Sequence, residues 1–378
     1  MVDAPGFEPF DIRVSDSTIV YHITAPPVPG VTDFGLNDIW KVQTNGTGNS
    51  PVVNTADAEL IRDVFSPWVI YERVVYAQNT LQSSTYRSAR LDGPGQGLVT
   101  DAHALYRLHI GERAVFDRIE SVGGGSIFSV LLDGTDLRTL ADIPSGAPPI
   151  TFLTSTATIG NQVLFTQSSY PQNVQNIFSV PVTGGPVVPV TQGDDYAWIG
   201  AILGSRIVYH RCPLVPNSDP TAPGPMAGPC DVYSALSDGS GTVALATRSE
   251  MESVQGVLGS QVLIRRTGSV SDTLFSIPVT GGAETFMLTL AAPNEFVSGT
   301  IGDRVVLRRP TGLWSMKADG SGLVQLTTDP TDGLDGSTGP FICFQRGPAS
   351  QFELRCVPAD GSGPSTHVAT GANFVSGL

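Results

Sequence analysis

The chain contains few charged side chains and almost no lysine. Charged residues make up 15% of its 378 positions, and Lys41 and Lys317 are its two lysines. Acidic residues outnumber basic ones 35 to 21, which gives a formal net charge of −14. Phosphate groups are bound by clustered lysine and arginine, and anionic membrane surfaces attract basic clusters. We therefore expect neither nucleic acid nor a membrane surface as a partner.

Long hydrophobic runs are also missing. No stretch approaches the roughly 18 consecutive apolar residues of a transmembrane helix, so we expect no membrane span. The first ten residues, MVDAPGFEPF, contain neither the basic segment nor the apolar segment of a secretory signal. Two interpretations remain open at this point: a cytoplasmic protein, or an exported protein whose signal is absent from this chain.

The motifs of common enzymes are missing as well. The sequence has no G-x-S-x-G nucleophile motif and no G-x-x-x-x-G-K-(S/T) phosphate loop. Its five histidines form no H-x-x-x-H or H-x-H pair. His22 and His210 follow Tyr21 and Tyr209 at matching positions, and we expect both histidines at solvent-facing strand ends. The sequence therefore identifies no catalytic residue.

Glycine and proline are frequent, and an internal repeat accounts for many of them. Eight segments share an apolar or aromatic anchor, with Asp, Asn or Thr six residues later and Gly seven residues later. The anchors are Ile39, Tyr86, Ile127, Ile177, Val232, Leu274, Leu313 and Leu354. The glycines are Gly46, Gly93, Gly134, Gly184, Gly239, Gly281, Gly320 and Gly361. The Asp-Gly, Asn-Gly and Thr-Gly pairs at these positions supply the positive φ that tight hairpin turns require.

Each repeat predicts four short strands. One strand precedes the glycine turn, one follows it, and two more lie upstream of the anchor. Successive anchors are 39 to 55 residues apart, and tandem four-stranded units of this length are typical of β-propellers. A solenoid would require polar capping units at its ends, and none is found. We predict an all-β chain that forms one domain over residues 1–378, an eight-bladed β-propeller of four-stranded antiparallel blades.

The repeat also resembles a known family. The segment LWSMKADGSGLVQLTTDP, residues 313–330, is the copy most similar to the TolB-like, or PD40, propeller repeat. The resemblance covers about residues 10–378 and implies the propeller fold. Because the same repeat occurs in binding proteins, protease-associated domains and lyases, the resemblance implies no particular function.

The four cysteines fall into two pairs. Cys212 and Cys230 enclose the longest insertion in any repeat, and Cys343 and Cys356 flank a hairpin in which Cys356 replaces the repeat's serine. Each pair can meet across neighbouring strands, so we predict the disulfides Cys212–Cys230 and Cys343–Cys356. Disulfides persist in oxidising compartments, which favours an extracellular or periplasmic location. Four free thiols are the alternative.

The loops predict where a ligand binds. The glycine turns are short and alike, whereas the blade-to-blade loops and the loops between second and third strands vary, and variable loops on a rigid scaffold commonly carry function. Carboxylates gathered on that face favour a cationic ligand or a metal ion. The candidate ligand-binding residues are Asp194, Asp195, Tyr196, Trp198, Glu250, Glu252 and Glu295. Asp329, Asp332 and Asp335 are three apart rather than two, so they suit an acidic turn better than a Ca²⁺ loop.

Two functions of different class fit these observations. The first is a non-enzymatic, monomeric binding protein, exported by a bacterium, which takes a protein, peptide or glycan on its acidic variable-loop face without a cofactor. The second is a lyase or hydrolase whose Asp, Glu and His residues converge in the central channel, with a divalent metal such as Ca²⁺. The missing enzyme motifs favour the first.

Overall fold

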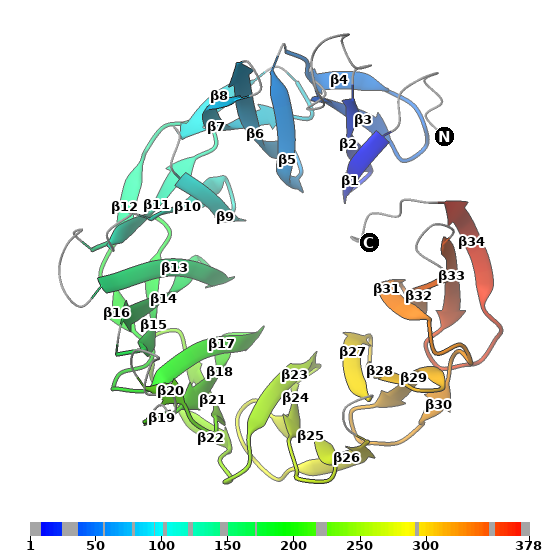
Figure 1. Ribbon diagram of the computed structural model, residues 1–378. Coiled ribbons are helices and arrows are strands. Elements are labelled where there is room, and N and C mark those ends of the chain that lie inside the picture. The colour runs from blue at the N-terminus through cyan, green and yellow to red at the C-terminus, as the bar shows by residue number, and fades with distance from the viewer. Residues whose placement is uncertain are drawn as a thin grey trace. The chain divides into compact units, whose positions relative to one another are not determined.

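The computed structural model describes residues 9–24, 37–55, 57–77, 80–93, 95–100, 104–119, 124–143, 150–170, 172–216, 225–291, 295–347 and 352–371. Every regular element in these ranges is a β-strand (Figure 1). Among these residues, no helix has the length and hydrophobicity of a membrane span. The sequence offers two alternatives for the innermost strand that closes the ring, residues 10–15 and residues 373–378. Residues 373–378 lie outside the described residues.

The chain divides into two compact units, and each is described by itself. Unit 1 comprises Met1–Ala147, Leu153–Ala157 and Pro181–Pro186. Unit 2 comprises Pro148–Phe152, Thr158–Val180 and Val187–Leu378. That the chain forms a single domain stays a prediction.

Unit 1 contains three four-stranded sheets in which each strand pairs antiparallel with the next along the chain. The first consists of β1 (Pro9–Ser15), β2 (Thr18–Thr24), β3 (Asn37–Gln43) and β4 (Ser50–Val53). The second consists of β5 (Ala58–Phe65), β6 (Trp68–Ala77), β7 (Thr80–Arg90) and β8 (Gln96–Thr100). The third consists of β9 (Ala104–Ile110), β10 (Arg113–Ile119), β11 (Gly125–Leu131) and β12 (Arg138–Ile143).

The next two strand groups share one sheet, which lies for the most part in unit 2. The first group is β13 (Ile150–Ile159), β14 (Gln162–Tyr170), β15 (Val174–Pro181) and β16 (Val188–Pro189). The second is β17 (Tyr196–Leu203), β18 (Arg206–Cys212), β21 (Asp231–Leu236) and β22 (Val243–Ala246). A single parallel pairing between Gln175 and Tyr196 joins the groups. The insertion after β18 forms a separate hairpin of β19 (Leu214–Val215) and β20 (Met226–Ala227).

Three more four-stranded antiparallel sheets complete unit 2. They are β23 (Glu252–Leu258), β24 (Gln261–Arg266), β25 (Asp272–Pro278) and β26 (Thr285–Leu290); β27 (Phe296–Ile301), β28 (Arg304–Arg309), β29 (Gly312–Lys317) and β30 (Val324–Gln325); and β31 (Gly333–Thr338), β32 (Phe341–Arg346), β33 (Phe352–Pro358) and β34 (Thr366–Gly371). The first strands β17, β23, β27 and β31 contact one another in succession (Figure 1). This arrangement of consecutive four-stranded meanders is that of β-propeller blades.

The repeat glycines form the turns between third and fourth strands, as the sequence predicts. Seven of the eight have φ between 70° and 85°; Gly93 is the exception, because its turn closes differently, with Arg90 N–H donating to Gly95 O. Gly239 also packs on the preceding strand group, where a Cβ would lie 2.7 Å from the carbonyl oxygen of Pro189. No larger residue fits there without displacing backbone.

The serine two residues after most anchors links one sheet to the next. In each case its hydroxyl donates to the carbonyl oxygen of the residue five after the following anchor. The pairs are Ser88–Leu132, Ser129–Val182, Ser179–Ser237, Ser234–Val279, Ser276–Ala318 and Ser315–Ala359. In the first repeat Lys41 Nζ makes the equivalent bond to Leu91 O. In the last repeat the position is taken by Cys356, which forms a disulfide.

Apolar side chains of the middle strands fill the space between successive sheets within each unit. In unit 2, Val208, Val232, Ile264 and Phe275 belong to one such cluster, and each is at most 1% exposed. Burial of side chains of this size contributes about 1.5–3 kcal/mol each. The cores therefore hold neighbouring sheets together, and the loops at the sheet edges are left to vary.

Both predicted disulfides are present. Cys212 is joined to Cys230 and Cys343 to Cys356, each with a Cα–Cα distance of 4.1 Å. Cys343 and Cys356 stand directly opposite each other on β32 and β33. The first disulfide closes the base of the insertion that carries β19 and β20.

The expectation for two histidines is wrong. His22 and His210 are 1% and 4% exposed rather than solvent-facing. Each ring accepts a hydrogen bond at Nε2 from a backbone N–H of the next sheet, at 3.0 Å from Ile61 and 3.0 Å from Val254 respectively. The sequence pattern places both histidines near strand ends, where exposure is expected. In the structure, the first strand of the adjacent sheet covers both rings.

Candidate functional site

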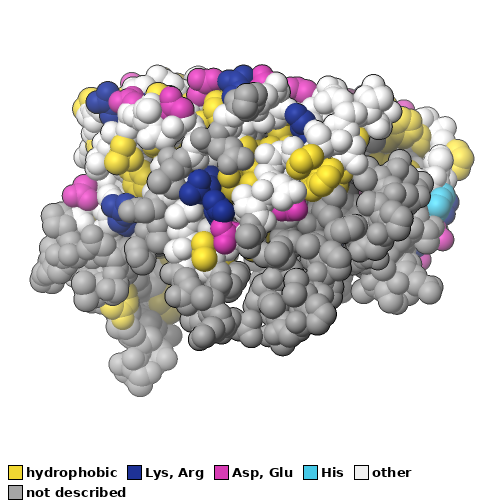
Figure 2. Space-filling model, turned by 90° about the horizontal axis from the view of Figure 1, so that it is seen from above, with side chains coloured by type: hydrophobic (Ala, Val, Ile, Leu, Met, Phe, Trp, Pro, Cys, Tyr) yellow, Lys and Arg dark blue, Asp and Glu magenta, His cyan; other side chains and the backbone are white. Residues whose placement is uncertain are grey.

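The predicted acidic residues of unit 2 mostly have an arginine partner. In four successive strand groups, a carboxylate at the start of the first strand pairs with an arginine at the end of the second strand. The pairs are Asp195–Arg211, Glu252–Arg266, Glu295–Arg309 and Asp332–Arg346. On the face that Figure 2 shows, acidic and basic side chains also lie next to one another. Pairing neutralises much of the field that these carboxylates would otherwise produce.

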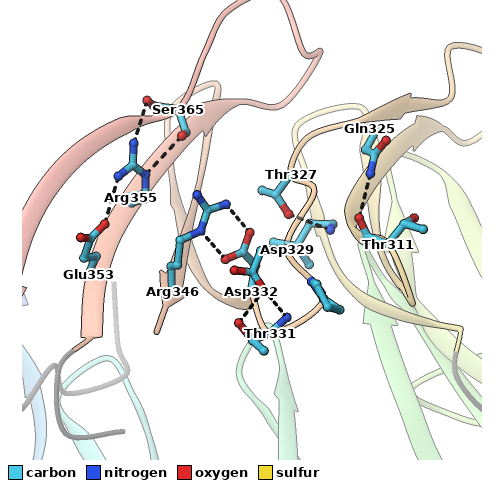
Figure 3. A network of polar contacts seen from close by, with 12 residues as sticks. Thr311, Gln325, Thr327, Asp329, Thr331, Asp332, Arg346, Glu353, Arg355 and Ser365 are labelled. Atoms are coloured by element: carbon cyan, nitrogen blue, oxygen red, sulfur yellow. Dashed lines mark hydrogen bonds and ion pairs between the residues drawn. The ribbon is translucent and has the colours of Figure 1, made fainter. Parts of the chain in front are cut away.

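The acidic turn before β31 illustrates the arrangement (Figure 3). Asp332 is fully buried and accepts from Arg346 Nε at 2.8 Å and from Nη2 at 2.6 Å. Asp329 caps the turn by accepting from the N–H of Thr331 at 2.9 Å. Asp335 accepts from Gln345 at 2.6 Å. Each of the three carboxylates thus has its own protein partner, as expected for a structural acidic turn.

Glu252 is an internal anchor of its sheet. It lies opposite Arg266 in the β23–β24 ladder, is fully buried and accepts from Arg266 Nε at 2.8 Å. Burial raises the pKa of Glu252, and the Arg266 guanidinium opposes that rise. The same guanidinium also binds the partly exposed Glu284 at 2.7 Å. A ligand could therefore reach Glu252 only by displacing Arg266.

The equivalent position in unit 1 is paired differently. Glu59 stands opposite Arg73 in the β5–β6 ladder, but the Arg73 guanidinium binds Asp57 at 2.5 Å. Glu59 is fully buried and accepts a hydrogen bond from Thr55 Oγ1. Burial raises the pKa of Glu59 to about 7. This carboxyl group therefore changes its charge near neutral pH.

Tyr196 and Trp198 form an aromatic pair on β17. Their ring centroids are 5.6 Å apart, and both side chains are half-buried. Trp198 stacks on His210 with centroids 4.4 Å apart and planes 18° apart. Because His210 is itself fixed by its bond to Val254 N–H, the indole is held in one orientation with part of its surface open.

An exposed carboxylate precedes each of the strands β17 and β23, which are the first strands of their groups. Asp194 comes shortly before β17 and Glu250 shortly before β23, and both are exposed. Neither forms an ion pair within the described part of the chain. Glu295, by contrast, is paired with Arg309 at 3.1 Å and accepts from Ala291 N–H at 3.0 Å. The structure thus separates the seven predicted residues into an open set, Asp194, Tyr196, Trp198 and Glu250, and a paired set, Asp195, Glu252 and Glu295.

Two contributors to this region were missed by the sequence analysis. His210 stacks against the indole of Trp198, and burial lowers the pKa of His210 to about 4. Arg211 binds Asp195 and lines a surface pocket of about 470 Å³ together with Tyr209, Thr242 and Asp238. A carboxylate followed 14 to 16 residues later by arginine recurs in the sequence, so the pairs could have been recognised from the repeat.

No model of a known protein family matches this chain, and neither does any curated protein sequence. Among solved structures, a prolyl endopeptidase is similar over 93% of this chain and 53% of its own, at 13% identity and a TM-score of 0.48. The chain thus spans about half the length of that enzyme. The β-propeller domain of the Trilobed protease from Pyrococcus furiosus is similar over 96% of this chain and 97% of its own, at 11% identity and a TM-score of 0.43.

Proposed function

We propose that this chain is an exported, monomeric binding protein with the TolB-like repeat, an eight-bladed β-propeller that holds a protein, peptide or glycan ligand without a cofactor and without chemical change at the ligand site. The observation that carries the proposal is the aromatic pair Tyr196–Trp198, fixed on β17 and adjacent in sequence to the exposed Asp194. Rigid aromatic side chains with an exposed polar neighbour are typical of binding surfaces.

The blade count and the location rest on separate observations. Eight repeat anchors, each in the third strand of a four-stranded group, support eight blades. Two disulfides support an oxidising compartment, since thiols stay reduced in the cytosol. The Cys212–Cys230 disulfide also fixes the end of β18, the strand that carries His210 beneath Trp198.

A cationic peptide is the ligand class that the open charges favour. Asp194 and Glu250 keep their charges available, whereas arginine neutralises Asp195, Glu252 and Glu295. Arginine and lysine side chains of a peptide could pair with the two open carboxylates and lie over the indole of Trp198, since cations are attracted to aromatic faces. A neutral glycan would use the aromatic pair but not the carboxylates.

The test is a peptide and glycan array followed by titration of the best binder with variants. Asp194→Lys and Trp198→Ala should each weaken binding while the thermal unfolding temperature stays nearly constant, and binding should weaken as salt rises. Asp194→Lys is a cleaner change than Asp195→Lys, which would also break the pair with Arg211. The matched control is Asp303→Lys, because Asp303 is an exposed carboxylate in the turn between β27 and β28.

The outcome decides between the two ends of the sheets. If both Asp194→Lys and Trp198→Ala bind as the unchanged protein does, the proposed site is wrong. If Asp303→Lys abolishes binding instead, the ligand binds at the end of the sheets that carries the turn between β27 and β28. Equal loss in Asp194→Lys and Asp303→Lys would indicate a non-specific charge effect and would also contradict the proposal.

A further inference from the structure

A polar cluster in unit 1 joins two neighbouring sheets. Asp63 lies on β5, and Tyr106 and His109 lie on β9. Tyr106 Oη donates a hydrogen bond to Asp63 Oδ2, and His109 Nδ1 lies 2.8 Å from the same oxygen. The other carboxylate oxygen accepts from the N–H of Val64 at 2.9 Å. Phe65 stacks on the His109 ring, with centroids 3.5 Å apart and planes 8° apart.

These contacts fix the protonation pattern of the imidazole. Burial opposes the ionisation of Asp63, but the hydrogen bonds from His109 and Tyr106 outweigh it and lower the pKa of Asp63. An ionised Asp63 can only accept, so His109 Nδ1 must carry the proton of the neutral ring. The lone pair then resides on Nε2, the nitrogen on the other side of the ring.

The ring is partly exposed on the side away from Phe65. The His109 side chain as a whole is 31% exposed. Its Nε2 makes no hydrogen bond within the described part of the chain. His22 and His210 differ in both respects, because each is buried and uses Nε2 to accept a backbone N–H. A carboxylate-oriented, partly exposed imidazole is the arrangement that accepts protons in general-base sites.

The surroundings favour an uncharged ligand. Asp63 carries a negative charge that disfavours anions. The arginines beside the cluster in sequence are occupied, since Arg62 pairs with Glu72 and Arg107 binds Asp117 at 2.7 Å. The ring face on one side is apolar, because Phe65 covers it.

We propose that Asp63, Tyr106 and His109 form a general-base site in which His109 Nε2 activates water toward an uncharged ester. His109 is the catalytic residue, and Asp63 and Tyr106 are positioning residues. Water forms a bond to the acyl carbon while its proton moves to Nε2. The bond between the acyl carbon and the alcohol oxygen breaks, the oxygen leaves with the electron pair, and the imidazolium returns the proton to that oxygen or to solvent.

This site is independent of the ligand site proposed above. All its residues belong to unit 1, whereas Asp194, Trp198 and Glu250 belong to unit 2. Asp194→Lys should therefore leave ester hydrolysis unchanged, and loss of His109 should leave peptide binding unchanged. The two proposals can fail separately.

The first measurement needs no variant. Diethyl pyrocarbonate transfers an ethoxycarbonyl group to an unprotonated imidazole nitrogen that it can reach. At pH 7, peptide mapping by mass spectrometry should show His109 modified at least about tenfold faster than His22 and His210. Modification of His109 at or below their rate would show that Nε2 is not available, and the proposal would be overturned.

The second measurement is hydrolysis of p-nitrophenyl acetate, followed by nitrophenolate absorbance from pH 5 to 9. His109→Gln should lower the protein-dependent rate about tenfold or more, within the range of general-base contributions. The matched control is His367→Gln, which removes an exposed histidine on β34 and should leave the rate unchanged. Equal rates for His109→Gln and the unchanged protein, or no protein-dependent rate, would overturn the proposal.

The positioning role of Asp63 has its own readout. Asp63→Asn keeps the imidazole but removes the carboxylate that accepts from Nδ1 and stabilises the imidazolium. It should lower the hydrolysis rate, and Asp63→Glu, which restores a carboxylate, should recover part of that loss. Tyr106→Phe retains Asp63 and His109 and should reduce the rate less than Asp63→Asn does. A hydrolysis rate that Asp63→Asn leaves unchanged, or a loss that Asp63→Glu does not reduce at all, would refute the assigned role.

Discussion

Ser276 on β25 donates a hydrogen bond of 2.8 Å to the carbonyl oxygen of Ala318, in the turn that follows β29 of the next sheet. The serine is 2% exposed, whereas Ala318, which accepts the bond, is half-buried. Ser276→Ala should destabilise the protein by about 1 kcal/mol, because the carbonyl loses its donor and is only partly open to water. Urea unfolding at neutral pH measures this loss.

The control for this prediction is Ser321→Ala. Ser321 is exposed, and its hydroxyl bonds to Asp319 in the glycine turn. Its removal should change the free energy of unfolding by no more than about 0.5 kcal/mol. Equal effects of the two substitutions would show that the bond between sheets adds nothing to stability.

Because Glu59 is buried, we expect the free energy of unfolding to fall as pH rises. Its pKa in the folded protein is about 7, against an ordinary value of 4.5. The folded protein therefore holds this proton more tightly than the unfolded chain does, and the resulting stability is complete below pH 4.5 and lost as pH passes 7. Between pH 4.5 and pH 8, the unchanged protein should lose on the order of 3 kcal/mol relative to Glu59→Gln. Denaturant titrations of both proteins across this range test the difference; parallel curves would refute it.

The strands and turns were predictable because their signals are local. Asp-Gly, Asn-Gly and Thr-Gly pairs specify tight turns, and alternating apolar residues specify the flanking strands. The structure confirms the turns at seven glycines and both disulfides. Repetition added a second signal, since a serine in the same place in six repeats needs a common reason, and the bond to the next sheet supplies it.

The arrangement around the candidate sites depends on contacts between sheets, which no local pattern encodes. His22 and His210 look like strand ends, but their exposure is decided by a neighbouring first strand 39 to 44 residues away. Asp63 and His109 are 46 residues apart and meet because β5 and β9 begin consecutive sheets. The arginine partners of the acidic residues were overlooked for a different reason: each lies on the adjacent strand of the same sheet, at a spacing of 14 to 16 residues that recurs in the sequence.

Removing the Cys212–Cys230 disulfide should lower the free energy of unfolding and loosen the insertion that it closes. The two cysteines are 18 residues apart, and closing a loop of that size stabilises a protein by about 3 kcal/mol in the chain-entropy description. A Cys212→Ala/Cys230→Ala variant should unfold at lower denaturant concentration, and limited proteolysis should cut within residues 213–229 first. Cys343→Ala/Cys356→Ala is the comparison, because that disulfide encloses a shorter segment, with a sequence separation of 13 rather than 18. Unchanged proteolysis of the insertion would contradict the prediction.

For His210 we expect the opposite pH dependence: its contribution to the free energy of unfolding falls as pH drops. Its Nε2 must stay unprotonated to accept the Val254 N–H at 3.0 Å, and burial lowers its pKa to about 4 from an ordinary value of 6.5. The unfolded chain therefore binds the proton more tightly than the folded protein does. Stability that is complete above pH 6.5 should fall as pH drops toward 4, by on the order of 3 kcal/mol.

A His210→Gln variant isolates this effect, because glutamine can offer an oxygen acceptor and has no charge to gain. At pH 7 the unchanged protein should be the more stable of the two, since the imidazole also supports Trp198 by stacking at 4.4 Å. Between pH 7 and pH 4 its advantage should shrink by on the order of 3 kcal/mol and can reverse in sign, as urea unfolding at closely spaced pH values would show. The fluorescence of Trp198 should change over the same range, because protonation breaks the bond that holds the ring beneath it. An advantage that stays constant down to pH 4 would mean that His210 keeps its bond when charged, which the geometry at Nε2 does not permit.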